Sequence, residues 1–79
     1  MGEITQFIAI PFDLTSDGLL AAGIPFKCAT PASAIERAKG LWQILGHTGA
    51  VALVRTGYPE TETIVLRRFG IVPDELPII

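Results

Sequence analysis

Residues 30–46 read TPASAIERAKGLWQILG, the one stretch of the chain with a complete helical start, period and stop. Thr30 suits the N-cap, where its side-chain oxygen accepts a backbone N–H that has no helical partner. Pro31 suits the first helical position, because the N–H that proline lacks would be unpaired there. Gly46 suits the C′ position, which needs a left-handed backbone. This stretch predicts a single helix around which the rest of the chain is arranged.

The apolar side chains of this helix predict one buried face. At about 100° per residue they fall on one arc of roughly 120°, the width expected of a helix that lies on a core. Ser33 with Glu36 also offers a second, overlapping capping box. The residues of the arc are Ala34, Ile35, Ala38, Leu41, Trp42 and Leu45.

The composition is that of one small, apolar domain. The 79 residues are 49% hydrophobic and only 18% charged, against about 25% charged in an average soluble domain. A chain of this length has room for one hydrophobic core, so we expect a single domain over residues 1–79. It carries more apolar side chain than one helix and one small sheet easily hide.

Charge, cysteine content and hydropathy exclude several classes of protein. The net charge of −2 gives no electrostatic footprint for nucleic acid. Cys28 is the single cysteine and cannot form an intramolecular disulfide. The first residues lack the basic and apolar regions of a secretory signal, and the longest uncharged run, residues 40–54, is too short to span a bilayer. We expect a soluble cytoplasmic protein without a cofactor.

Four segments outside the helix predict β-strands. The first and third are apolar on both faces, which is typical of central strands, whereas the second carries glycine and proline and suits a sheet edge. Pro11 cannot donate to a ladder, so either pairing ends there or its nitrogen points outward. In the tail we expect one helical turn at Asp74 and Glu75, with Leu76 on the core. The strand segments are residues 4–12, 19–29, 50–56 and 61–69.

One helix between two hairpins predicts a two-layer α+β domain of order β-β-α-β-β, with the helix on one face of a four-stranded, mainly antiparallel sheet. The spatial order second-first-third-fourth makes every neighbouring pair antiparallel and places the two apolar strands in the middle. The order second-first-fourth-third stays open, and it would join the hairpins through a parallel pair, as in ubiquitin-like grasp folds.

The helix covers only one face of such a sheet, although both faces carry apolar side chains. Leaving one of these side chains in water forgoes about 1.5 to 3 kcal/mol, and a whole domain is stable by only about 5 to 15 kcal/mol. The tail alone is too short to cover the second face. We therefore expect a non-enzymatic domain that binds a second copy, as a homodimer, or another protein, through the helix-free sheet face or a strand edge.

His47 and Cys28 are the residues most suited to chemistry, and neither lies in a known motif. His47 would need an orienting carboxylate and a nucleophile, and the nearest in sequence are Glu36 and Thr48. A polar residue at a helix C-terminus is the simpler interpretation. Cys28 has apolar neighbours, and such a cysteine is a small hydrophobe more often than a nucleophile. The helix places the two residues about 20 Å apart, so no catalytic residue is predicted.

Metal, phosphate and ligand-stacking sites are not predicted either. One cysteine and one histidine cannot build a structural zinc site, and Glu60 with Glu62 lacks the spacing of a calcium loop. Gly46 and Gly49 form a GxxG pattern that follows a helix, whereas a phosphate-binding loop precedes one. Trp42, on the helix arc, is expected in the core.

The alternative function is that of a nucleic-acid accessory protein. Four basic residues would form one edge if the two hairpins adjoin, with Tyr58 and Phe69 as aromatic partners for bases. The competing interpretation is a solvent-exposed strand end at which the basic side chains form ion pairs with Glu60 or Glu62. The four residues are Lys27, Arg55, Arg67 and Arg68, of which the last two point to opposite faces of one strand.

Three short segments resemble the arrangement of small bacterial proteins without assigned function. They are the Ile-Pro-Phe strand at residues 10–12, the Thr-Pro start of the helix and the Arg-Phe-Gly strand end at residues 68–70. This resemblance implies no activity, ligand or partner. The function therefore depends on which surface the fold exposes.

Overall fold

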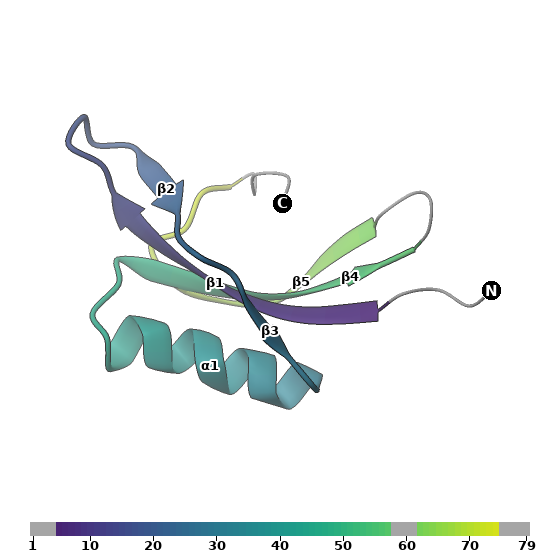
Figure 1. The fold of residues 1–79 in the computed structure, drawn as a ribbon. Helices are drawn as coiled ribbons and strands as arrows, with labels where there is room; N and C mark the ends of the chain where they lie inside the picture. Colours follow the sequence, from purple (N-terminus) through teal and green to yellow (C-terminus); the bar gives the residue numbers. More distant parts are fainter. Residues whose placement is uncertain (1–4, 58–61, 75–79) are drawn as a thin grey trace.

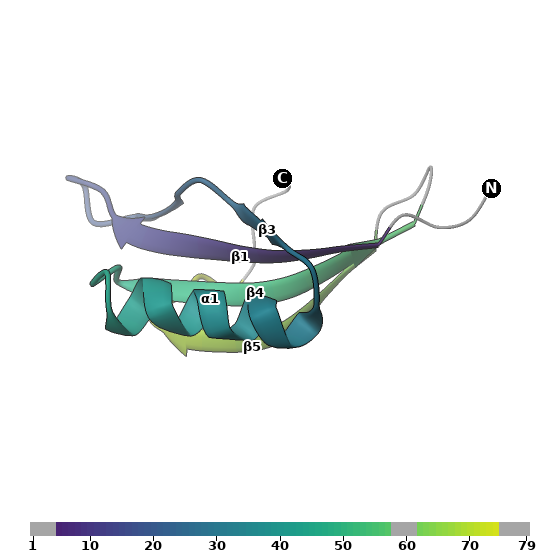
Figure 2. The ribbon, with the colours of Figure 1, turned by 60° about the horizontal axis from the view of Figure 1, so that its bottom comes forward.

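A computed structural model describes residues 5–57 and 62–74 of the chain. One helix packs on one face of an antiparallel sheet, in the order β-β-α-β-β, which confirms the predicted α+β class (Figures 1 and 2). Glu75 and Leu76, for which a tail structure was predicted, lie outside the described residues. The elements are β1 (Thr5–Leu14), β2 (Leu20–Ala22), β3 (Phe26–Cys28), α1 (Pro31–Gln43), β4 (Gly49–Thr56) and β5 (Glu62–Gly70).

The strands follow the first of the two predicted orders. The sheet runs β2-β1-β4-β5, with β3 also paired to β1, and every pair is antiparallel. The parallel pair of the alternative order is absent from the described strands. β5 contains a bulge, because Leu53 lies opposite Val65 while Ala52 lies opposite Arg67, which leaves Leu66 as the extra residue.

The predicted second strand is divided into two, and Pro11 explains the division. β2 pairs with the end of β1, β3 pairs with its first half, and Gly23 donates its N–H to the Pro11 carbonyl between them at 2.8 Å. Proline returns no N–H, so the ladder has a gap on this side. On its other side β1 stays paired with β4 past Pro11 as far as Phe12. The sheet therefore has five strands, of which β2 and β3 lie one after the other along the same edge of β1.

The start of α1 is as predicted, but its end is not. Thr30 and Ser33 close one reciprocal capping box, with Thr30 N to Ser33 Oγ and Ser33 N to Thr30 Oγ1 both at 3.0 Å. Because Ser33 is used in this way, the separate box with Glu36 does not form. The helix ends at Gln43, and Leu45 is 66% exposed rather than part of the core face. Leu45 does not lie on the apolar face of the helix, because the helix ends before Leu45 and the chain changes direction at Gly46, where φ is +79°.

α1 lies close to the sheet because small side chains line the contact. Ala34 and Ala38 are fully buried against alanines of β1 and β4, and Leu41 belongs to the same cluster. Trp42 packs against this cluster and stacks on Phe69 of β5, with 5.9 Å between the ring centroids. The alanines of the sheet are Ala9, Ala50 and Ala52.

The face of the sheet without a helix carries the larger buried side chains. They alternate along β1 and β4 with the residues that face α1, and none is more than 2% exposed. Leu20, Val65 and Val72 pack against them. Figure 1 shows the segment after β5 on the side of the sheet away from α1. The buried residues are Ile8, Ile10, Phe12, Val51 and Leu53.

This burial corrects one expectation from the sequence. The centre of the helix-free face was expected to need a cover from outside the chain, and the single chain already buries it. The cover comes from Leu20 of β2, Val65 of β5 and Val72. The turn after β5 brings Val72 to this face. Apolar side chains that remain in solvent must be sought elsewhere on the molecule.

Two opposing glycines make the turn after β5 possible. Gly49 faces Gly70 across the β4–β5 pair, and Ile71 donates its N–H to the Thr48 carbonyl at 3.1 Å. A Cβ on Gly49 would overlap the carbonyl of Ile71. Gly70 has φ +65°, and a Cβ there would overlap the ring of Trp42. The chain can cross to the helix-free face only because both positions lack a side chain.

Replacing Gly49 by alanine tests this crossing. We expect Gly49→Ala to lower the free energy of unfolding by about 3 kcal/mol or more, since the added methyl overlaps backbone rather than a movable side chain. Gly18→Ala is the matched control, because Gly18 has φ +81° in open space and should cost only about 1 kcal/mol. Urea denaturation measures both, and equal losses would contradict the crowded turn.

Candidate functional site

Part of the exposed apolar surface lies at the end of α1 and along the β2–β3 edge of the sheet. Ile44 is 82% exposed and Leu45 66% at the C-terminal end of the helix, and Ile24, between β2 and β3, is 79% exposed. Phe26 of β3 is partly exposed beside α1, where the Arg37 guanidinium lies 5.3 Å from the centre of its ring. Neighbouring exposed apolar side chains, such as Ile44 and Leu45, are typical of a binding surface.

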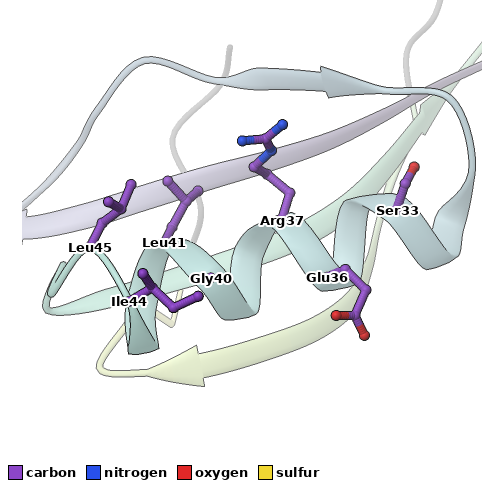
Figure 3. Close-up of a pocket in the computed structure, with 7 residues that line it drawn as sticks. All are labelled: Ser33, Glu36, Arg37, Gly40, Leu41, Ile44 and Leu45. Carbon is purple, nitrogen blue, oxygen red and sulfur yellow. The ribbon is translucent and has the colours of Figure 1, made fainter.

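A groove of about 570 Å³ runs along the outer side of α1. Its residues form two rows at i, i+4 spacing, one of which points towards the sheet edge in Figure 3. That row continues from Ser33 through Arg37 and Leu41 to Leu45. The other row has Glu36 and Ile44 with Gly40 between them, and Gly40 leaves a gap in it. We call this feature the α1 groove, lined by Ser33, Glu36, Arg37, Gly40, Leu41, Ile44 and Leu45.

Neither the backbone conformation nor the packing of the described residues requires a glycine at position 40. Its φ is not positive, and a Cβ there would meet only the Cδ1 of Ile44, at an ordinary 3.9 Å. Glycine inside a helix nevertheless costs about 1 kcal/mol relative to alanine. Gly40 therefore lies at the centre of the groove without a contact among the described residues that requires a glycine.

The charges on the groove balance. Among the described residues that line the groove, Glu36 and Arg37 are the only charged ones, one of each sign. Arg37 lies over the Phe26 ring, where a guanidinium is favoured by the negative face of the aromatic system. The groove therefore has no net charge that would select a strongly acidic or basic ligand.

Asp13 and His47 form a hydrogen-bonded pair that sequence reasoning missed. Asp13 Oδ2 lies 2.6 Å from His47 Nδ1, and Asp13 Oδ1 accepts the Thr48 N–H at 3.1 Å. The hydrogen bond from His47, and then that from Thr48, hold the pKa of Asp13 below its usual value. The orienting carboxylate is thus Asp13 of β1, not Glu36. The pair joins the end of β1 to the loop after α1.

This pair lacks the third partner that nucleophilic catalysis requires. Among residues 5–57 and 62–74, no serine, threonine or cysteine side chain forms a hydrogen bond with the His47 ring. Cys28 lies opposite Phe7 on β1, six residues before Asp13, which at 3.3 Å per residue is about 20 Å along the strand. Cys28 packs against the cluster under α1. The geometry suits a structural contact between the end of β1 and the loop after α1 rather than a catalytic pair.

The four basic residues do not lie together. Lys27 is on β3 at one edge of the sheet, Arg67 and Arg68 are on β5 at the other, and Arg55 lies between them on β4. By register Arg68 shares the face of Val51 and Arg67 shares the opposite face. Phe69 is stacked on Trp42, while Tyr58 and Glu60 lie outside the described residues. The predicted basic edge is not formed.

The described part of the chain holds no group of three or more metal-ligating side chains. Within it, α1 is also too short and too polar to cross a bilayer. No family model, curated protein or solved structure matches the chain. The α1 groove, with its exposed apolar border, is therefore the candidate functional site.

The Asp13–His47 pair predicts a pH dependence of stability. The pKa of Asp13 is lower in the folded chain than its ordinary 3.8, so its contribution is complete above about pH 5 and is lost as the pH falls through the folded-state value. Asp13→Asn should therefore reduce stability near neutral pH and lose this penalty in acid. Urea denaturation between about pH 2 and pH 7 measures this, with Glu36→Gln as control, and parallel curves for wild type and Asp13→Asn would contradict it.

Proposed function

We propose that this chain is a non-enzymatic domain that associates with a second copy of itself through the α1 groove and the bordering β2–β3 edge. The observation that carries the proposal is the exposure of Ile44 and Leu45 at the end of α1 and of Ile24 between β2 and β3, while the residues of both core clusters are buried. Burying an exposed aliphatic side chain contributes about 1.5 to 3 kcal/mol. Three such residues, counted twice in a symmetric pair, supply a driving force for association.

A protein-binding role also fits the chemistry of the described side chains. The Asp13–His47 pair has no nucleophile, and the α1 groove is apolar and charge-balanced. The separation of Lys27 from Arg67 and Arg68 across the sheet gives a nucleic-acid role no comparable support. Both sheet edges are short or irregular, so the helix side offers the larger continuous contact.

Sedimentation equilibrium tests the proposal. Between about 1 µM and 1 mM we expect the mass to rise towards twice the 8.4 kDa of the chain. Ile44→Glu should weaken the dimer at least about tenfold, because it would bury an unpaired carboxylate.

Ile64→Glu is the matched control, since Ile64 is also exposed, by 54%, but lies on β5, at the opposite edge of the sheet from β2 and β3 and outside the α1 groove. It should leave the association unchanged. A chain that stays monomeric over the whole concentration range would overturn the proposed function.

A further inference from the structure

We infer that two copies of α1 cross at Gly40, each helix placing a row of side chains in the α1 groove of the other. The inference rests on the proposed function and names its contact. It is carried by three independent features of the described chain: the shape of the groove, the unexplained glycine and the balance of charge.

The shape of the groove is that of a helix-packing surface. Two rows of residues at i, i+4 spacing border it, and such rows on two helices interdigitate at a crossing angle of about 50°. Ile44 stands in the row that Gly40 interrupts (Figure 3). A second helix can place its own row in the channel between the two rows, with Leu41 forming part of the floor.

Gly40 sets the crossing point. Helices approach most closely where the contact residue has no side chain, and Gly40 is the gap in the outer row. The chain itself places nothing near this gap except Ile44 Cδ1, at 3.9 Å. An α1 helix of a second copy brings its own Gly40 to the same point, which allows the shortest approach of the two backbones.

The charges are compatible with a second copy and disfavour a strongly charged partner. Each groove carries Glu36 and Arg37 within one turn of Gly40. A two-fold pair therefore brings one acid and one base from each side, so the contact stays neutral. A strongly charged partner would find no matching excess of the opposite sign.

Gly40→Leu separates this contact from folding. Leucine favours the helix over glycine, and position 40 has open space in the single chain, so the urea midpoint of the monomer should rise. The added side chain holds the two backbones apart, so the dimer should weaken at least about tenfold. Lys39→Leu, on the polar side of the same turn, is the control and should leave the dimer intact.

A disulfide measures the position of the crossing. Helix axes about 8 to 10 Å apart bring two Cα atoms at the contact within about 6 Å, inside the range of a disulfide. Gly40→Cys in a Cys28→Ala background should form a covalent dimer with oxidised glutathione, and Lys39→Cys should not.

The outcomes distinguish this inference from the proposed function. A wild-type dimer that tolerates Gly40→Leu and does not cross-link at position 40 overturns the crossing but leaves self-association standing. A wild-type chain without any dimer overturns both. A dimer lost in Gly40→Leu, whose monomer is more stable than wild type, supports both.

Discussion

The contact between α1 and the sheet depends on alanine. Ala34 and Ala38 meet Ala9, Ala50 and Ala52, so the helix backbone lies close to the strands and little volume separates the two layers. The large side chains, such as Ile10, Phe12 and Leu53, lie on the other face of the same strands. A larger residue at either alanine of the helix would lift α1 from β1 and β4. The helix is therefore held close to the sheet by small side chains.

The distribution of volume changes how the apolar excess of the chain is understood. The chain does not leave one sheet face open; it closes that face with Val72, Leu20 and Val65 after a turn through Gly49 and Gly70. Part of the excess appears instead beyond the last turn of α1, at Ile44 and Leu45. The mismatch between apolar residues and available cover is real, but it lies outside the centre of the helix-free face.

Local signals predicted well and long-range ones did not. Thr30, Pro31 and Ser33 are neighbours, so the helix start could be predicted from the sequence. The strand order also followed from alternation and from two hairpins. The sequence shows that Pro11 cannot donate a hydrogen bond. Its effect, however, is to divide the neighbouring strand into β2 and β3, and the periodicity of that neighbouring strand does not reveal this division. Asp13 and His47 are 34 positions apart, and only the fold brings them together. Gly40 does not belong to the apolar arc of the helix, and only the fold shows what surrounds it.

The gap at Pro11 also limits how large an assembly this chain can build. A free, regular sheet edge is a template for continuous strand addition, and such addition does not stop at two chains. Here one edge is divided by Pro11 and Gly23, and the other is bent by the bulge at Leu66. Stacking edge on edge into a fibre is therefore disfavoured on both sides, even though the chain is unusually apolar. Self-association of the proposed kind would therefore use side-chain contacts rather than strand addition.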